Sequence, residues 1–479
     1  MDRFGTLVLC CAKHSGSWAA PTRIWQELEP NCTSAIVNAK EIALTKRTAV
    51  GLLALLLLGL ALGGCHLRPL LHDVMVQPDV ISPDADGTDD ATNIEYKLSR
   101  NAVVSIYFEN DSGERFYFRK ERPRSAGDYR VQWGGTVNQR WFLDNEYGQQ
   151  TVESWVLPDG TYTWVIEATG EDGETVSEKG QITLSGGDQV VPELRKFTVT
   201  LPEFTPNQDG LADRTGVSYF LNKDVNNVQV YLYHPDNPDM LYPLEEQERA
   251  AKPGEAGHHY YDYDGGVDRG ADPPPDGTYV VVAEARDLAG HHIVVSNTLT
   301  IMLGGKPRAE VVNGEIHWGG AVSSQEGTEI YLPLGATLQF TTYIENYGSV
   351  PIRTSGPMPG THYRSDQNYN TMAVEMGEES FHQQAGVWRF GINFDISTID
   401  FPYRWAVGTE EELRCEIIEG REQCFLDPGE RGTVTGSIEM VGPFPRTQIF
   451  AWGGLIHEYV GINAENNYVD QINLNIDEP

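Results

Sequence analysis

Two acidic loops with the same spacing carry the residues of this 479-residue chain that are best suited to binding a cation. Their oxygen-bearing side chains are Asp84, Asp86 and Asp90 in the first loop and Asn207, Asp209 and Asp213 in the second. Hard cations such as Ca²⁺ prefer clustered oxygens on a tight turn that contains glycine, and they take about 6–8 oxygen ligands. The same residue types also build turns without a metal, because Asp and Asn cap their own backbone. The sequence is therefore compatible with two interpretations of these loops, a pair of Ca²⁺ sites or a pair of metal-free turns.

The histidine pairs His258-His259 and His291-His292 raise the question of zinc. Zinc needs three or four converging ligands, whereas adjacent residues on a strand point to opposite faces. We therefore expect partly buried or edge histidines and not metal ligands.

The chain contains no serine nucleophile elbow, no His-Glu-x-x-His helix, no Cys–His pair and no phosphate-binding glycine loop. Carboxylates are abundant, so composition alone does not exclude a glycosidase pair. We expect a non-catalytic chain, with an unrecognised catalytic site in the last third as the alternative.

A short apolar segment near the start predicts export. It opens with Lys46-Arg47 and ends with Leu62-Gly63-Gly64-Cys65. The apolar run between them is shorter than the ~20 residues of a spanning helix, but it has the length of a signal-peptide core. The ending resembles a bacterial lipobox, and that resemblance implies that Cys65 is lipidated and becomes the mature N-terminus. An ordinary signal peptide or a short membrane anchor is the alternative.

Residues 1–64 are accordingly assigned to a leader that is removed, or to a start that the native protein lacks, with translation beginning near Val37 or Leu44. Beyond Cys65 only Cys415 and Cys424 remain, on either side of a predicted Glu419-Gly420 turn. In an exported protein this spacing favours one disulfide across a hairpin over a metal site or two free thiols.

The net charge of −34 repels nucleic acid and anionic lipid headgroups. It suits a solvated extracellular surface, a bound cation or a basic partner. Aromatic residues make up 10% of the chain, so the charge does not indicate disorder.

An internal repeat of about 120 residues organises the middle of the chain. Three landmarks recur in the same order: the acidic loop, an Ala-Gly followed by a strand ending in Trp133-Gly134-Gly135 or Tyr263-Asp264-Gly265, and the Pro-Asp-Gly-Thr-Tyr of 158–162 and 275–279. Between them apolar and polar residues alternate, as in Ile94, Tyr96 and Leu98. Such alternation predicts half-buried antiparallel strands, and each copy is expected to be a β-sandwich.

These landmarks resemble the immunoglobulin-like domain of flagellar hook-capping proteins, a domain type that recurs in bacterial surface and secreted proteins. The resemblance covers roughly residues 74–185 and 192–303. It implies a spacer and interaction module and no catalyst. The first copy departs from it at Asp84-Ala85, and the second has Tyr263 in place of Trp.

The last region is not a third copy. Its landmarks are Glu345-Asn346-Tyr347-Gly348, Pro428-Gly429-Glu430 and Glu465-Asn466-Asn467. This order is loosely similar to the CARDB-type immunoglobulin-like domain of bacterial adhesion proteins. The middle, about 350–410, does not fit and is rich in aromatics, among them Tyr363, Tyr369, Trp388, Tyr403 and Trp405. These five are candidates for a ligand-binding surface, although aromatics more often fill a core.

The sequence thus predicts an all-β protein of three tandem immunoglobulin-like antiparallel β-sandwiches after an N-terminal signal segment. The predicted parts are a leader (1–64), a lipid-anchored linker (65–73), repeat 1 (74–185), repeat 2 (192–303) and a C-terminal CARDB-like sandwich (308–479). We expect an extracytoplasmic, membrane-anchored lipoprotein whose repeats form a stalk for a domain that binds an envelope protein or a glycan. A carbohydrate-binding lipoprotein and an envelope-assembly subunit are alternatives.

Overall fold

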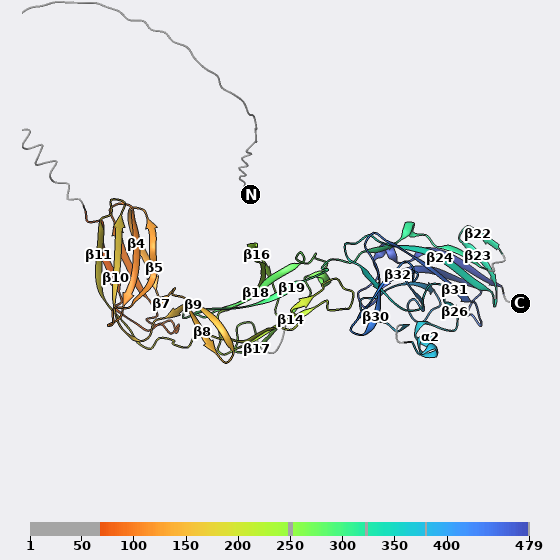
Figure 1. The fold of residues 1–479 in the computed structure, drawn as a ribbon, viewed down its shortest axis with the longest axis horizontal. Helices are drawn as coiled ribbons and strands as arrows, with labels where there is room; N and C mark the ends of the chain where they lie inside the picture. The colour runs from red at the N-terminus through yellow and green to blue at the C-terminus, as the bar shows by residue number, and fades with distance from the viewer. Residues whose placement is uncertain (1–67, 248–251, 321–323, 379–380, 478–479) are drawn as a thin grey trace, which may run out of the picture. The chain divides into compact units, whose positions relative to one another are not determined.

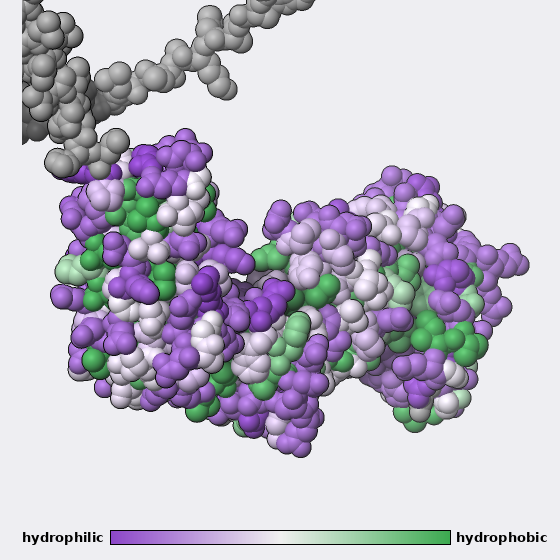
Figure 2. Space-filling model, turned by 60° about the vertical axis from the view of Figure 1, so that its left-hand side comes forward, coloured by the Kyte–Doolittle hydropathy of each residue, from purple (hydrophilic) through white to green (hydrophobic). Residues whose placement is uncertain are grey.

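The computed structural model describes residues 68–477 apart from 248–251, 321–323 and 379–380. The predicted leader, the signal segment and Cys65 lie outside the described residues. Within the described part, no helix combines the length and apolar character that crossing a membrane requires. On the face drawn in Figure 2, hydrophilic residues cover most of the surface and apolar patches are small, as expected for a strongly charged chain.

Repeat 1 is built from two sheets, seen at one end of the coloured ribbon in Figure 1. The three-stranded sheet has the order β1-β3-β6, with bounds Leu71–Gln77, Thr92–Leu98 and Gly127–Trp133. The five-stranded sheet has the order β2-β11-β10-β4-β5, with bounds Val80–Ile81, Thr175–Leu184, Gly160–Gly170, Ala102–Glu109 and Arg115–Arg124. Leu70 and Leu71 are buried in this core, so β1 begins within the segment predicted as a linker.

Alternation along the strands drives the packing of repeat 1. Strand β3 alternates fully between buried and half-buried positions, which places Ile94, Tyr96 and Leu98 inside. Phe108 on β4 stacks on Trp133 of β6 with ring centroids 3.6 Å apart, and so joins the two sheets. This confirms the sandwich that the period-two pattern predicts.

An insertion in repeat 1 extends into the second repeat. It forms β7 (Thr136–Val137), β8 (Trp141–Asn145) and β9 (Gly148–Val156). Strand β9 pairs with β19 of repeat 2, where Ile293 opposes Val152. Val152 is fully buried in the core of repeat 2. The extra length of repeat 1 between its second and third landmarks therefore completes a sheet of the next repeat.

Repeat 2 has the same strand plan. Its three-stranded sheet, β12-β14-β17, comprises Leu194–Val199, Thr215–Leu221 and Gly257–Tyr263. Its larger sheet, β16-β15-β18-β19, comprises Asn237–Pro243, Asn227–His234, Gly277–Arg286 and His292–Ile301, with β13 (Glu203–Phe204) on β19 and η1 (Val267–Arg269) nearby in sequence. Tyr219 of β14 and Val281 of β18 share one core.

The C-terminal region contains two larger sheets. One holds β20 (Ala309–Val311), β21 (His317–Gly320), β24 (Thr337–Asn346), β26 (His362–Arg364) and β31 (Arg431–Glu439). The other holds β22 (Ser324–Glu326), β23 (Glu329–Pro333), β25 (Ile352–Thr354), β27 (Trp388–Phe394), β28 (Tyr403–Ala406), β29 (Arg414–Ile418), β30 (Arg421–Leu426), β32 (Gln448–His457) and β33 (Val469–Asp477). Phe340 of β24 packs against Phe390 of β27 and Trp405 of β28, which joins the sheets.

The fold class is confirmed as all-β, with two departures from the prediction. Among the described strands, five short pairings are parallel: β2–β11, β13–β19, β23–β33, β25–β27 and β26–β31. The C-terminal region also contains helical turns that the sequence did not indicate: α2 (Tyr369–Met376), η2 (Val312–Gly314) and η4 (Ala464–Asn466). Helix α2 begins at Asn368, whose side chain accepts from the backbone N–H groups of Asn370 and Thr371.

Candidate functional site

The two acidic loops share positive-φ positions and three equivalent internal hydrogen bonds. In each, the first side chain accepts from the backbone N–H two residues on: Asp84 from Asp86, and Asn207 from Asp209. The last carboxylate accepts from the glycine N–H, 2.8 Å from Gly87 to Asp90 and 2.6 Å from Gly210 to Asp213. Positive φ recurs at equivalent positions: Ala85, Gly87 and Asp89 in the first loop and Gln208, Gly210 and Ala212 in the second. The acidic residues therefore shape the turns.

The first loop keeps its carboxylates at the surface. Ligand oxygens of Asp84, Asp86 and Asp90 lie within 4.8 Å of one another. At least one oxygen of each carboxylate is already an acceptor for backbone N–H groups. The Ca²⁺ prediction for this loop stays a prediction.

The second loop is covered by the C-terminal region. Asp209 is 8% exposed. Burial first, and then the charge of Asp213, raise the pKa of Asp209 to about 6, although Arg353 opposes the rise. Arg353 donates through Nε to the backbone oxygen of Asp209, at 2.5 Å, and through a terminal nitrogen to Ala385, also at 2.5 Å. A cationic guanidinium beside a carboxyl with a raised pKa disfavours a bound cation here.

The backbones meet closely at this contact. A Cβ on Gly210 would lie 2.0 Å from the oxygen of Ala385, and one on Gly386 would lie 2.1 Å from the carbonyl carbon of Asp209. His457 donates through Nε2 to the backbone oxygen of Gln208, at 2.8 Å, and stacks on Trp388. Burial lowers the pKa of His457 to about 4, so this imidazole is neutral at pH 7. The loop of repeat 2 is thus a contact with the next region.

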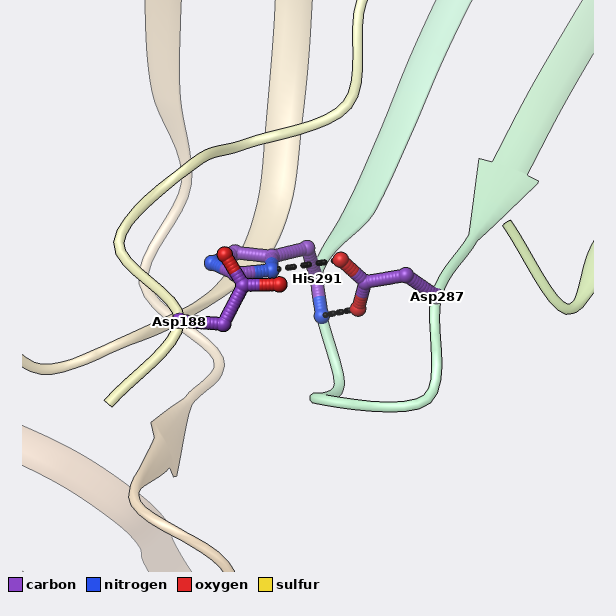
Figure 3. A group of neighbouring side chains, drawn as sticks. All are labelled: Asp188, Asp287 and His291. Carbon is purple, nitrogen blue, oxygen red and sulfur yellow. Dashed lines mark hydrogen bonds and ion pairs between the residues drawn. The ribbon is translucent and has the colours of Figure 1, made fainter. Parts of the chain in front are cut away.

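A second polar cluster joins the two repeats. Figure 3 shows Asp188, from the segment that follows repeat 1, beside Asp287 and His291, from the turn between β18 and β19. Asp287 accepts from the Nδ1 of His291 at 2.8 Å and from the His291 backbone N–H at 2.9 Å. Ligand atoms of the three residues lie within 4.8 Å of one another, so their geometry alone permits a metal.

Lys223 supplies a positive charge to this cluster. Its ammonium group donates to Asp188 at 2.5 Å and to Asp287 at 3.0 Å. Burial alone would raise the pKa of Asp287, but the bonds and charges of His291 and Lys223 outweigh it and hold that pKa at about 2. An ammonium that bridges both carboxylates occupies oxygens that a metal would need, which favours a structural contact over a metal centre.

The remaining repeat landmarks are also structural. The tyrosine of each Pro-Asp-Gly-Thr-Tyr donates to the carbonyl four residues earlier, Tyr162 to Pro158 at 2.8 Å and Tyr279 to Pro275 at 2.7 Å. His259 replaces Tyr129 and reproduces its hydrogen bond to the carbonyl four residues before it. Its other ring nitrogen contacts Glu246, so His259 is a buried, partnered histidine.

The five aromatics proposed as a ligand surface lie in the core. Trp405 and Tyr363 are fully buried, and Tyr369, Trp388 and Tyr403 are at most 4% exposed. Their polar atoms are partnered inside: Trp405 Nε1 donates to Thr361, and the Tyr363 hydroxyl donates to Arg404. The binding-surface hypothesis is wrong for these residues, because closing the two sheets of the C-terminal region requires large side chains between them.

Sequence reasoning missed a buried ion network beside this core. Glu458 is 3% exposed and lies between two guanidinium groups. Arg404 donates to both of its carboxylate oxygens, at 2.6 and 2.8 Å, and Arg389 donates to one at 3.3 Å. Arg404 also lies over the ring of Tyr369, 4.1 Å from its centroid. No local pattern links residues so far apart in sequence, so only the fold reveals the network.

The predicted disulfide is confirmed. Cys415 on β29 pairs directly with Cys424 on β30, and their sulfurs are bonded at 2.04 Å. It closes an exposed hairpin at the edge of the larger C-terminal sheet, with Glu419 and Gly420 at the turn in positive φ.

No protein-family model and no curated protein matches this sequence. Among solved structures, a Ca²⁺-stabilised adhesin with which an Antarctic bacterium binds ice aligns over 85% of this chain and 74% of its own, at 13% identity and a TM-score of 0.21. A 1.5-MDa bacterial ice-binding adhesin aligns over 85% and 96%, at 11% identity and a TM-score of 0.18. Escherichia coli alpha-2-macroglobulin aligns over 86% of this chain but only 23% of its own, at 11% identity and a TM-score of 0.17. Scores this low identify no common arrangement of the whole chain.

Proposed function

We propose that this chain is a non-catalytic, extracytoplasmic binding protein held to a membrane by lipid on Cys65. The two repeats act as a spacer. The C-terminal region presents a surface to an envelope or extracellular partner.

The spacer role is supported by one observation: the polar residues that recur in both repeats form hydrogen bonds that shape turns. In both repeats the acidic loop and the Pro-Asp-Gly-Thr-Tyr motif form the same backbone hydrogen bonds. Strand pairing between β9 and β19 and the contacts of Lys223 and Arg353 join consecutive parts of the chain. Residues committed to turns and joints hold domains in order and leave little for chemistry.

A spacer between membrane and binding domain requires that the chain be anchored stably to the membrane. One acyl chain binds a membrane only marginally, whereas two or more anchor a protein stably, and the lipobox resemblance implies such multiple acylation. A tethered stalk then sets how far the C-terminal region reaches from the bilayer.

The carbohydrate-binding alternative gains nothing from the aromatics of 363–405. A sugar-stacking site needs exposed rings, and the five candidate rings are buried. An enzyme would need a pocket that joins a nucleophile or paired carboxylates, and Glu458 is instead neutralised by Arg389 and Arg404.

The anchor is tested by expressing the full chain with Cys65→Ser in a bacterial host and fractionating the cells. Wild type is expected in the membrane fraction, and Cys65→Ser in the soluble fraction. Cys32→Ser is the matched control, because Cys32 precedes the predicted cleavage site and its loss should change nothing. Equal membrane retention of Cys65→Ser and wild type would refute lipid anchoring.

The partner is sought by chemical crosslinking of the wild-type protein in intact cells. Crosslinks to other envelope proteins are expected within 308–479 and not within the repeats. Crosslinks confined to the repeats, or binding of a purified glycan through residues 308–479 and of no protein, would contradict the tethering version of the proposal.

A further inference from the structure

One cleft in repeat 1 has a charge opposite to that of the chain. The cleft has a volume of about 500 Å³ and lies between β5 and the loop that joins β7 to β8. Five cationic residues and no carboxylate line it: Arg115, Arg119, Lys120, Arg122 and Arg140. In a chain of net charge −34, solubility alone gives no reason for cations to gather in one recess. We call this recess the basic cleft.

A bulge in β5 brings the central cations together. Arg122 opposes Val104 of β4 and Arg119 opposes Ile106, so Lys120 and Glu121 share a single opposite residue, Ser105. Glu121 has φ 49°, and its backbone N–H donates to the Ser105 hydroxyl at 3.0 Å. In a regular strand, neighbouring side chains point to opposite faces. The bulge breaks that alternation and lets both Arg119 and Lys120 line the cleft.

The central cations of the cleft differ from the flanking ones in their partners. Among the described residues, Arg119, Lys120 and Arg122 form no ion pair, whereas Arg115 pairs with Glu109 and Arg140 with Glu153. Arg119 lies over the ring of Phe118 and Lys120 over that of Tyr117, each 5.2 Å from the ring centroid. The rings hold the cations in the cleft and leave their charge unneutralised.

Edge protection is the simpler explanation for charge on β5, which lies at the end of its sheet (Figure 1). Charges, a bulge and a proline such as Pro123 do discourage pairing with another strand. Edge protection accounts for charges along β5 itself, where lysine is a favoured choice, but it does not require a cleft whose lining contains no carboxylate. It also gives no reason for Arg140 to converge from another element. The same bulge and proline disfavour a peptide that would add as a strand.

We propose that the basic cleft binds one strand of an acidic polysaccharide. Its carboxylate groups engage Arg119, Lys120 and Arg122, and the amides of Asn138 and Gln139, which also line the cleft, hydrogen-bond its hydroxyl groups. A thin polymer touches only the cleft, whereas an anionic bilayer would also meet the acidic surface around it and be repelled. This site is separate from the C-terminal surface and does not depend on the proposed anchoring.

The test uses the full chain carrying Cys65→Ser, immobilised and titrated with polygalacturonate at about 0.15 M salt, where charges beyond ~8 Å are screened. Polygalacturonate is expected to bind and neutral dextran is not. Phosphatidylglycerol vesicles and poly-glutamate are the competing polyanions, and tighter binding of either would overturn the assignment to a polysaccharide. Absence of binding to polygalacturonate would overturn the proposal entirely.

Variants locate the site. The triple change Arg119→Gln, Lys120→Gln and Arg122→Gln is expected to weaken binding at least about tenfold, from three partly exposed charge contacts. The control, Lys179→Gln, Lys196→Gln and Arg308→Gln, removes the same charge at exposed positions outside the cleft and should change affinity less than about twofold. Equal losses in both would show general electrostatic attraction and refute the site.

Variants of the amides Asn138 and Gln139 test whether the cleft recognises a sugar polymer or binds polyanions in general. Asn138→Ala with Gln139→Ala is expected to weaken polygalacturonate about threefold or more, through lost hydrogen bonds. Affinity for poly-glutamate should hardly change. An equal effect on both polymers, or none on either, would remove the support for polysaccharide recognition. Unchanged circular dichroism and thermal midpoints show that each variant folds.

Discussion

Arg353 of the C-terminal region donates its Nε proton to the backbone oxygen of Asp209 in repeat 2. The Arg353 guanidinium thereby binds a turn of repeat 2 that Asn207 and Asp213 of the same repeat already stabilise. In the part of the chain that the structure describes, no guanidinium from another region contacts the equivalent loop of repeat 1, where Asp84 and Asp86 are exposed. The same local motif therefore serves as a free turn in one copy and as a domain contact in the other.

Loss of this guanidinium should uncouple the C-terminal region from repeat 2. Arg353→Ala removes hydrogen bonds to Asp209, Ala385 and Gln423 and leaves buried carbonyls unpaired. We expect a loss of about 2–4 kcal/mol, since hydrogen bonds to charged groups contribute ~1.5–3 kcal/mol and orphaned acceptors add a penalty. Calorimetry should show a separate, earlier transition. Arg364→Ala, which breaks an exposed pair with Asp366, should change stability far less than Arg353→Ala does. Equal losses of stability in the two variants would contradict the proposed contact between repeat 2 and the C-terminal region.

Asp209 should make stability fall as the pH rises. Its pKa is about 6 in the folded chain and 3.8 in the unfolded chain, so the folded state binds the proton more tightly. The stabilisation that the protonated Asp209 provides is fully present below about pH 4 and is lost as the pH rises through 6. Asp209→Asn should therefore match wild type near pH 4 and exceed it by about 2–3 kcal/mol above pH 6.

The difference between variant and wild type, from urea unfolding at each pH, isolates this effect. His457, with its pKa lowered to about 4, acts in the opposite direction in both proteins: its contribution is present above pH 6.5 and is lost as the pH falls. Asp86→Asn, the equivalent change in the exposed first loop, is the control. A pH-independent difference for Asp209→Asn would show that its carboxyl is not in the environment described.

Asp90 decides between a metal-free turn and a calcium site. Asp90→Ala removes acceptors for the N–H groups of Ala85 and Gly87. We expect a loss of about 1–2 kcal/mol, as for other capping side chains, with or without EDTA. The measurement compares the thermal midpoints of wild type and variant in about 1 mM Ca²⁺ and in EDTA. This Ca²⁺ concentration matches the affinity range of extracellular calcium-binding modules. A cost that appears only with Ca²⁺ would establish the metal instead.

Trp405 should contribute to stability and not to ligand binding. It is fully buried against Phe340 and Tyr363. Trp405→Ala should cost about 3–5 kcal/mol through the cavity it leaves. Tyr343→Ala, at a 42% exposed position, should stay within ~1 kcal/mol in the same urea titration. A folded, equally stable Trp405→Ala that lost a ligand would reopen the binding-surface hypothesis.

Local patterns predicted the strands and turns of the repeats well, because period-two burial and Asp-Gly turns are decided by neighbouring residues. Ile94, Tyr96 and Leu98 are buried as expected, and Cys415 pairs with Cys424 across its hairpin. The start of β1 at Leu71 was missed, since its alternation begins inside what reads as a linker.

Contacts between residues distant in sequence could not be predicted from local sequence patterns. Nothing near Val152 indicates that it fills the core of the next repeat, and nothing near Arg353 names Asp209 as its partner. The aromatics of 363–405 were ambiguous in the same way: their types favour a core but are also found on sugar-binding faces, and only the sheet pairing decides between the two. The basic cleft was missed for a related reason, because Arg140 joins it from another element.

Mass spectrometry of the N-terminal peptide from the native, membrane-extracted protein tests the anchored-spacer account most directly. The account predicts a chain that begins at Cys65 and carries diacylglycerol in thioether linkage on the sulfur. A free thiol at that position, or a mature chain that retains residues 1–64, would contradict it.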